Sequence, residues 1–600
     1  MSTGENTQNA SFWQFDQRLA RRLNEEPYSS YNRQIMPIER YCTHPVSSCE
    51  VDYSRAILSL PLRGLQGKTQ VFPTDREFFV RSRLTHTLEV AVNATTIFDE
   101  IIARGNRTIG EGSEQGQSKT FLLDDEIQMM RYALMTACLL HDVGNPPFGH
   151  FGEETIRDWF KGRRSRTQDD SPANTKSESP ANMEDNLSSD TEDYDRDLCY
   201  FEGNANSLRI ALRGTRLFDG RRMNPTLLTL CALIKYPWDS AEALKKDPEK
   251  VKYNYFISDA KMISALCDQC GDVVKISDGE RSRLSRVMEA ADDISYVTSD
   301  FEDAFRKGKF TVDEVLTYLM DGWLSERDNA LFSGNSTKAN AFTLLYLLAF
   351  IAGDEQTFSW ITNIINEKQL DDQTENLIAW KGKIGPNYAE WLLDAQDTNK
   401  GVNQHTQHTF RSSLQDYSEC ELDATQKRQI QETYVGRWVD IARNWLCYSA
   451  ACSLSKEDTM HKGDVPLFAS HYMTVELLKK VLKHFVYDAP DNAKMNARAE
   501  TVLKGLLDKF IPAVEECVRN NEDDEHTPVC PKGLSSTTRA LLTLIPMRYR
   551  LDYEAAYQSS SPRWDVNRQK YELDMMALDF ISSLPDDYAI QLYSELYKAV

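Results

Sequence analysis

The helical spacing of apolar residues is the feature that most constrains the fold of this 600-residue chain. In residues 85–102, 126–140 and 281–305, apolar side chains recur every three or four positions, which places them along one face of an α-helix. Alternating patterns typical of strands are few, and only residues 67–73 suggest a short extended piece. The chain is therefore expected to be an all-α protein with minor β structure.

The composition limits the compartment and the kind of partner. A net charge of −22 argues against a generally basic nucleic-acid binder, so an anionic ligand would need a local group of Lys, Arg or metal. Twelve cysteines are too sparse for a disulfide framework. The N-terminus lacks the basic and apolar regions of a signal peptide. The most apolar run, residues 341–352, is too short to cross a membrane. We expect a cytoplasmic protein with no membrane contact.

An acidic segment interrupts the helical pattern. Residues 167–197 contain ten Asp or Glu, two Lys or Arg and five Ser, but one Leu and no Ile, Val or Phe. Such a composition cannot bury enough apolar surface to offset the entropy lost on ordering. The prediction is a disordered acidic insertion, at about residues 165–198, between two parts of one domain.

The stretch LLHDVGNPPFGHFGEE, residues 139–154, carries the first chemical signal. A helix-like apolar run ends in His141 and Asp142, whose side chains can converge on an ion at the helix end. Imidazole with carboxylate suits Mn, Fe, Co, Ni or Zn, and also Mg where carboxylate and water dominate. Alone the pair is a weak indication, because many His–Asp dipeptides lie on protein surfaces.

The same stretch then breaks the helix. Residues 145–147, Asn-Pro-Pro, cannot continue it, because proline lacks the amide donor and disfavours helical geometry in the residue before it. The chain must turn, which can bring His150 back towards the metal. Glu153 is expected in the first turn of the next helix, paired with His150. A carboxylate on one imidazole nitrogen raises the basicity of the other, as a general acid or base requires. The alternative is a loop histidine that caps the turn.

Two further segments offer candidate ligands. His86 lies near the start of an amphipathic helix, where it is either a metal ligand or a histidine at the rim of a core. Asp292, Tyr296 and Asp300 are four residues apart and therefore share one helix face. That face is either a solvated acidic surface or a pocket wall with a metal at one end.

These residues together resemble a known family. The order of His86, His141-Asp142 and Asp292 is similar to the H…HD…D signature of the HD-domain phosphohydrolases. Five stretches between residues 68 and 296 resemble motifs of the deoxyguanosine triphosphate triphosphohydrolases: KTQVFP, RLTHTLEV, HDVGNPPFGHFGEE, FEGNANSLRI and EAADDISY. A sixth likeness lies at residues 578–596. The chain is identified as a member of this family.

The resemblance implies a helical HD-domain bundle with accessory C-terminal helices. It implies an N-terminal arm at residues 1–60 and an HD core at 61–310. A helical region at 311–600 would complete the nucleotide pocket and an oligomer interface. The implied ligands of a divalent metal are His86, His141, Asp142 and Asp292. Mn or Mg is expected first, with Fe, Co or Ni as alternatives. The implied catalytic residues are His150 and Glu153.

The resemblance also implies the substrate contacts. Arg83 shares a helix face with His86, three residues on, and resembles the phosphate-contacting Arg of the family. The other implied contacts near the phosphates are Asn204, Lys235, Tyr236 and Lys252, although each Lys alone is equally well a solvated surface charge. Asn206 stands where the family has Gln, so any contact there is in doubt. The implied sugar and base contacts are Gln70, Val71, Tyr296 and Asp300, with the Tyr296 ring crowding a 2′-hydroxyl.

The function implied is hydrolysis of dGTP to deoxyguanosine and tripolyphosphate, which controls the dNTP pool. Three alternatives stay open. The first is a broad dNTP triphosphohydrolase activated by a nucleotide. The second is an HD nucleotidase or cyclic-nucleotide phosphodiesterase. The third is a nucleic-acid-binding regulator with a degenerate HD fold. The resemblance further implies a homo-oligomer, with hexamers common, and leaves single-stranded DNA binding open.

Overall fold

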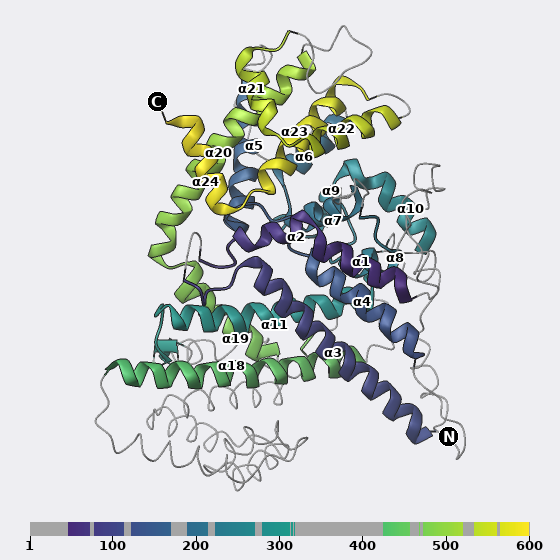
Figure 1. The fold of residues 1–600 in the computed structure, drawn as a ribbon, viewed down its shortest axis with the longest axis vertical. Coiled ribbons are helices and arrows are strands. Elements are labelled where there is room, and N and C mark those ends of the chain that lie inside the picture. Colours follow the sequence, from purple (N-terminus) through teal and green to yellow (C-terminus); the bar gives the residue numbers. More distant parts are fainter. Residues whose placement is uncertain are drawn as a thin grey trace. The chain divides into compact units, whose positions relative to one another are not determined.

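The computed structural model describes residues 46–72, 77–112, 122–169, 189–213, 223–270, 279–312, 424–455, 472–519, 533–560 and 564–598, with a few isolated positions between them. Residue contacts divide the chain into two compact units. Unit 1 comprises residues 1–289 and 490–600, and unit 2 comprises residues 290–489. The described part is helical, which confirms the all-α class (Figure 1). The boundaries expected at residues 60 and 310 stay predictions.

In the first helix group of unit 1, the helix α4 (Asp124–Leu140) packs against α1 (Val46–Leu58), α3 (Arg83–Gly112) and α8 (Leu227–Leu233) (Figure 1). Met130, Leu134 and Cys138 recur every four residues along α4, and all three are buried. The helical spacing seen in the sequence therefore follows from a helix surrounded by others. This group carries the end of α4, and with it the His-Asp pair.

The second helix group of unit 1 surrounds α20 (Pro490–Arg519). Its neighbours are α5 (Gly149–Asp169), α21 (Ser536–Leu544), α23 (Val566–Ser582) and α24 (Asp586–Tyr597), and α22 (Met547–Ser559) packs on α23. Phe510 of α20 meets Phe580 of α23 with ring centroids 5.3 Å apart, inside a continuous buried cluster. Asp565 caps α23 by accepting a bond from the amide of Arg568 at 2.7 Å, as an N-cap carboxylate does.

Shorter helices complete unit 1. They are α2 (Leu60–Gly64), η5 (Leu65–Gly67), α6 (Ser189–Cys199), α7 (Gly203–Arg213), α9 (Ser240–Lys246), η7 (Ile257–Asp259) and α10 (Ala260–Cys270). The extended piece expected at residues 67–73 is reduced to one isolated bridge between Thr69 and Ser82. No strand longer than that bridge occurs among the described residues.

The acidic insertion needs a correction at both ends. The helix α5 continues to Asp169, and residues 189–199, which include the end of the segment, form α6. Leu198 and Cys199 join the core, and Asp197 is buried with three hydrogen-bond donors on its carboxyl group. Apolar residues just beyond the segment thus anchor its last turns. Residues 170–188 lie outside the described residues.

Unit 2 contains the greater part of α11 (Arg283–Arg306), together with α18 (Ala424–Ser455), α19 (Tyr472–Leu482) and the π-helical turn η10 (Lys483–Tyr487). Phe301 of α11 packs on Trp438 of α18 with centroids 4.9 Å apart. Lys479 of α19 pairs with Asp293 at 3.3 Å. The apolar run at residues 341–352 lies outside the described residues.

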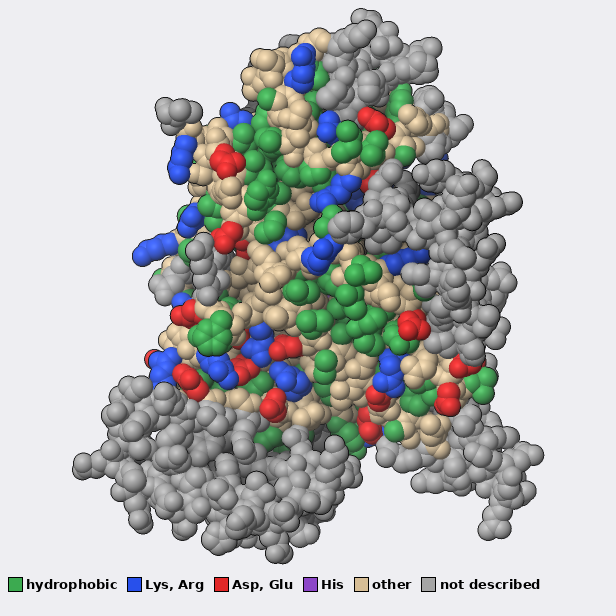
Figure 2. All heavy atoms as spheres, in the orientation of Figure 1, with side chains coloured by type: hydrophobic (Ala, Val, Ile, Leu, Met, Phe, Trp, Pro, Cys, Tyr) green, Lys and Arg blue, Asp and Glu red, His purple; other side chains and the backbone are tan. Residues whose placement is uncertain are grey.

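The described surface gives two further results. None of the helices that could be searched is both long and apolar enough to cross a membrane. On the face drawn in Figure 2, acidic and basic side chains are interspersed with hydrophobic ones. The large negative charge of the chain therefore does not form a field of one sign on that face.

Candidate active site

The break after α4 is a strained turn. The helix ends at Leu140, and the amide of Asn145 bonds to the carbonyl of Asp142 at 3.2 Å. Phe148 and Gly149 have φ angles of 65° and 62°, and a bulky residue in this left-handed region is strained. The next helix, α5, begins at Gly149. Glu153 therefore lies at the start of its second turn, whereas the sequence predicted the first turn.

His86 and His141 lie close together at the end of α4. Their ligand atoms are within 4.8 Å of each other, and both side chains are buried. The Nδ1 of His141 is 2.6 Å from the carbonyl oxygen of Cys138. Because a carbonyl only accepts, Nδ1 carries the proton and Nε2 is left as the ligand atom. Asp142 Oδ1 lies 3.7 Å from that Nε2. These donors fit a divalent transition metal.

The Asp142 carboxylate is itself held in place. Arg83 donates from Nη1 to Asp142 Oδ2 at 2.7 Å, and Asn145 donates to Oδ1. Arg83 is 3% exposed, and a side chain at position 149 would collide with its guanidinium group. The structure therefore places Arg83 against a candidate ligand, where it orients the carboxylate, as supporting residues at metal sites do.

His150 and Glu153 form the pair that the sequence suggested. Nδ1 of His150 lies 3.3 Å from Oε2 of Glu153, and the side-chain exposures are 76% and 3%. An ionised carboxylate only accepts, so Nδ1 of His150 donates and Nε2 faces outward. A buried carboxylate thus fixes the tautomer of an exposed imidazole, which can then give or take a proton at Nε2.

Two cations, Arg157 and Lys252, neutralise Glu153 and its neighbour Glu202. Together these residues form an acid–base network, defined as His150, Glu153, Arg157, Glu202 and Lys252. Lys252 Nζ lies 3.0 Å from Glu202 and 3.9 Å from Glu153. Arg157 donates to Glu202 at 2.9 Å and to Glu153 at 3.4 Å. Burial alone would raise the pKa of Glu153, but Lys252, His150 and Arg157 together hold this pKa well below its usual range.

The start of α7 fixes the turn from behind. Ser207 Oγ accepts from the amide of Gly144 at 2.9 Å and donates to the carbonyl of His141 at 2.7 Å. The amide of Gly203 donates to Glu153 Oε1 at 2.9 Å. A Cβ at Gly144 would overlap the backbone of Ser207 and Gly203. Asn206 is likewise structural, because its amide donates to the Gly144 carbonyl at 2.8 Å.

Two residues from distant segments were missed by sequence reasoning. Asp586 accepts from the amide of Phe148 at 3.0 Å and from the amide of Thr69 at 3.0 Å. It therefore ties the strained turn to the start of the candidate base pocket. Lys68 donates to the Asn145 carbonyl at 2.5 Å, and burial together with the nearby Arg83 lowers the pKa of Lys68 to about 7. Only their place inside the KTQVFP and C-terminal motifs pointed to them.

The other candidate substrate residues of unit 1 lie on three segments of the chain. Val71 is buried, and Oε1 of the half-buried Gln70 has no hydrogen-bond partner among the described residues. Asn254 accepts from the amides of both Lys235 and Tyr236, at 2.9 and 2.6 Å, which shapes that loop. The side-chain amide of Asn204 donates to Glu202 at 2.6 Å.

The candidates of unit 2 lie along α11. The rings of Tyr296 and Tyr487 stack with centroids 5.8 Å apart and planes 6° from parallel. Tyr487 donates to Asp300 Oδ2 at 3.0 Å. Burial raises the pKa of Tyr296 to about 12. Tyr487, which sequence reasoning missed, belongs to the π-helical turn η10, an irregularity frequent at functional sites. Asp292 lies on α11, three residues beyond the end of unit 1.

The sequence of this chain is similar to sequences of known proteins. A family model described as HD domain matches residues 83–170. A deoxyguanosinetriphosphate triphosphohydrolase of Enterobacter sp. (strain 638) is 28% identical over 91% of this chain and 93% of its own length. The protein of the same name from Salmonella typhimurium (strain LT2) is 35% identical over 49% of this chain and 58% of its own length.

A deoxyguanosinetriphosphate triphosphohydrolase-like protein of Listeria monocytogenes is 36% identical over 45% of this chain and 53% of its own length. The alignments thus span about half of the Salmonella and Listeria relatives, and nearly all of the Enterobacter protein. The HD match covers the His-Asp pair and the acid–base pair of α5. The chain is therefore a hydrolase that belongs to the deoxyguanosinetriphosphate triphosphohydrolase family of the HD-domain phosphohydrolases.

Proposed function

We propose that this enzyme hydrolyses dGTP to deoxyguanosine and tripolyphosphate with the help of a divalent metal ion. Water adds to the α-phosphorus, and the bond from that phosphorus to the 5′-oxygen or to the bridging oxygen must break. For these products it is the bond to the 5′-oxygen, which leaves with a proton. The observation that supports the proposal most is an exposed imidazole, fixed by the buried Glu153, on the helix that follows the His-Asp turn.

The proposed metal ligands are His86, His141, Asp142 and Asp292; the ligand atoms of His86 and His141 lie within 4.8 Å of each other. The helix α11 supports including Asp292. Ser282, just before this helix, donates to the Cys231 carbonyl at 2.8 Å, so the helix starts from a fixed point in unit 1. Asp292 follows on the same continuous helix. When bound, the metal polarises the phosphate and makes water more acidic.

His150 is the proposed residue for proton transfer, and Glu153 positions it. The outward Nε2 of His150 gives a proton to the 5′-oxygen or takes one from water, while Glu153 stabilises the imidazolium form. Arg157 and Lys252 keep Glu153 ionised, so the carboxylate stays an acceptor for the Nδ1 proton. The proposed proton transfer uses side chains of α5 and Lys252, together with the backbone amide of Gly203 at the start of α7.

The phosphate contacts are proposed to be Arg83, Asn204, Lys235, Tyr236 and Lys252. Arg83 and Lys252 now pair with Asp142 and Glu202, so binding of the triphosphate would compete with those carboxylates or share the cations. Tyr296 is proposed to pack on the deoxyribose, and Asp300 to bond its 3′-hydroxyl. Gln70 and Val71 are proposed to contact sugar and base. The buried Oε1 of Gln70 has no hydrogen-bond partner among the described residues, and a buried polar group left unpaired by the wrong sugar is costly.

Product analysis tests this function. The protein is incubated with each dNTP and with GTP, first with Mn²⁺ and then with Mg²⁺, and the products are separated by ion exchange. Deoxyguanosine and tripolyphosphate from dGTP are expected. Monophosphate with pyrophosphate would contradict the proposal, and equal rates on all four dNTPs would favour the broad-specificity enzyme.

Two neighbouring carboxylates provide a matched pair of variants. Glu153→Gln should lower kcat by about 10- to 100-fold, the usual cost of losing a supporting residue at a catalytic site. Glu154→Gln changes the next residue, which is exposed, and should keep the wild-type rate. Equal rates for the two variants would remove Glu153 from the mechanism.

Assembly and DNA binding stay predictions. The family resemblance supports a homo-oligomer, which light scattering of the purified protein measures directly. Single-stranded DNA binding would have to use a local basic groove, given the net charge of −22. Filter binding at several salt concentrations tests it, because phosphate contacts make affinity fall steeply with salt.

A further inference from the structure

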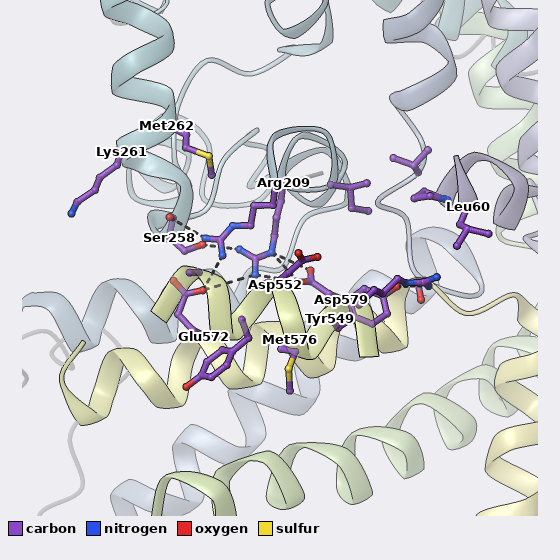
Figure 3. Close-up of a pocket in the computed structure, with 18 of the residues that line it drawn as sticks. Leu60, Arg209, Ser258, Lys261, Met262, Tyr549, Asp552, Glu572, Met576 and Asp579 are labelled. Atoms are coloured by element: carbon purple, nitrogen blue, oxygen red, sulfur yellow. Dashed lines mark hydrogen bonds and ion pairs between the residues drawn. The ribbon is translucent and has the colours of Figure 1, made fainter. Parts of the chain in front are cut away.

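A cavity of about 430 Å³ lies in unit 1, apart from the candidate catalytic residues (Figure 3). Its walls come from α7, α10, α22 and α23 and from the start of α2 at Leu60 and Pro61. Ligand pockets commonly measure roughly 300–1,000 Å³, so its size suits a small molecule. None of the proposed metal ligands or acid–base residues lines it; Val143 and Lys68 lie between it and the His-Asp turn.

The floor of the cavity is a closed set of ion pairs, the Arg209 network, defined as Arg209, Arg213, Asp259, Glu572 and Asp579. Arg209 donates from two nitrogens to Asp579, at 3.1 Å each. Arg213 donates to Asp259 at 2.6 Å and to Glu572 at 3.1 Å. The two guanidinium groups thus meet three carboxylates, and they have little capacity left to bind an anion (Figure 3).

Four other basic side chains line the same cavity: Lys68, Lys261, Arg548 and Arg568. Lys68 donates to the backbone carbonyls of Asn145 and Ser582. Arg548 lies 4.6 Å from the ring centroid of Tyr549 and donates to its hydroxyl at 2.9 Å. Within the described part of the chain, Arg548 and Lys261 pair with no carboxylate, and Nε of Arg548 is buried with no acceptor. Arg548 is therefore held in position by an aromatic ring while its charge is still available to a ligand.

The lining also offers flat and adaptable apolar surfaces. Trp564 packs edge-on against Tyr553, with centroids 5.7 Å apart, and Arg568 lies 5.5 Å from the Trp564 ring. Met262 and Met576 add flexible side chains, which adjust to the shape of a ligand. An anion with a planar ring matches both kinds of surface, because guanidinium groups and aromatic rings both stack on planar rings.

The charge balance limits how highly charged that anion is. Lys261, Arg548 and Arg568 face one further lining carboxylate, Asp552, while the Arg209 network carries one more acid than base. Lys68 adds at most one more charge, because burial lowers its pKa to about 7. The excess positive charge is therefore small. A ligand with one or two negative charges suits it better than a triphosphate, whose extra charge would meet Glu572 and Asp579.

We propose that this cavity is a second ligand site, which binds a small organic anion that carries a planar ring and one or two negative charges, as a nucleoside monophosphate does. Arg548 and Lys261 meet the anionic group, and the ring enters among Trp564, Tyr553 and the two methionines. The site goes beyond the proposed triphosphate hydrolysis and does not depend on it.

Calorimetric titration of the full chain tests the site. Adenosine monophosphate is the probe, because its adenine, ribose and single phosphate all differ from the proposed substrate. Adenosine, inorganic phosphate and inorganic tripolyphosphate are the comparisons. The monophosphate should bind at least about tenfold more tightly than each of them, since a charge-assisted hydrogen bond contributes about 1.5–3 kcal/mol. Absence of monophosphate binding, or equally tight binding of tripolyphosphate, would overturn the proposal.

A matched pair of arginine variants locates the site. Arg548→Gln should weaken binding of adenosine monophosphate at least about tenfold, because one charge-assisted contact is lost. Arg550→Gln changes an arginine two residues along α22 that does not line the cavity, and should bind like the wild type. Thermal unfolding of both variants checks that they fold equally well. Wild-type affinity in Arg548→Gln would refute this assignment of the cavity.

Discussion

The acid–base network and the Arg209 network are two buried charge clusters of unit 1 that differ at one end. Both set Lys or Arg against several carboxylates out of water. The acid–base network ends in His150, which is 76% exposed, whereas the Arg209 network consists only of arginines and carboxylates and contains no imidazole. Similar ion pairs therefore have two functions. A network that includes an exposed imidazole can move a proton, whereas a network of buried ion pairs alone holds helices together.

The largest expected effect comes from removing the exposed imidazole of the acid–base network. His150→Ala should lower kcat for dGTP by about 10²–10⁴-fold, the usual contribution of a general acid or base. The free energy of unfolding of this variant should change little, because the His150 side chain is mostly exposed. Steady-state kinetics and thermal unfolding measure the two. Turnover at the wild-type rate would show that the exposed imidazole of the network has no catalytic role.

The next largest effect comes from removing one carboxylate of the Arg209 network. Asp259 is 1% exposed and accepts from Arg213 at 2.6 Å. Asp259→Ala should lower the free energy of unfolding by about 3–5 kcal/mol, since removing one partner leaves a buried charge uncompensated. The rate per folded molecule should stay as in the wild type. Urea unfolding followed by circular dichroism gives the first quantity and active-fraction kinetics the second. A loss of kcat without a loss of stability would reverse the two roles.

The two networks were not equally predictable from the sequence. His150 and Glu153 are three residues apart, and the helix break was readable from Asn-Pro-Pro, so local rules of backbone geometry sufficed. The Arg209 network joins segments 370 residues apart at Arg209 and Asp579. Spacing and composition contain no signal for such a contact, because it depends on how helices pack.

The same limit explains the partners that were missed. The family resemblance implies that Arg83 and Lys252 contact phosphates, and the structure adds their carboxylate partners, Asp142 and Glu202. Asp586 reaches Phe148 across 438 residues. Helix positions followed from periodicity, and the candidate residues followed from family motifs. Which carboxylate neutralises which cation required the fold.

Asp197 is a buried carboxylate that belongs to neither network and has no cation partner among the described residues. It shows what burial does to a carboxyl group without a neutralising cation. Burial raises the pKa of Asp197 to about 7, above its ordinary value of 3.8. The folded protein therefore keeps this proton while the unfolded chain loses it, so stability falls as pH rises from about 4 to about 7. The asparagine variant Asp197→Asn imitates the protonated form.

Asp197→Asn should remove this loss, which amounts to roughly 2–4 kcal/mol. Urea unfolding at pH 4.5 and pH 7.5 measures it for both proteins. The variant should gain stability relative to the wild type at the higher pH. Parallel pH dependence in the two proteins would mean that Asp197 is ionised in the folded state.

The smallest effect concerns the cation that neutralises Glu153. Among the groups that lower the pKa of Glu153 against burial, Lys252 is the largest, so Lys252→Met should raise that pKa. The wild-type carboxylate stays ionised through the acid range, whereas in the variant it takes up a proton as pH falls and stops accepting from His150 Nδ1. The acid limb of the kcat profile should then move to higher pH. Lys250→Met, at an exposed position two residues earlier, should keep the wild-type limb. If both variants give the same profile, Lys252 does not set the protonation of Glu153, and the exposed imidazole works without electrostatic support from Lys252.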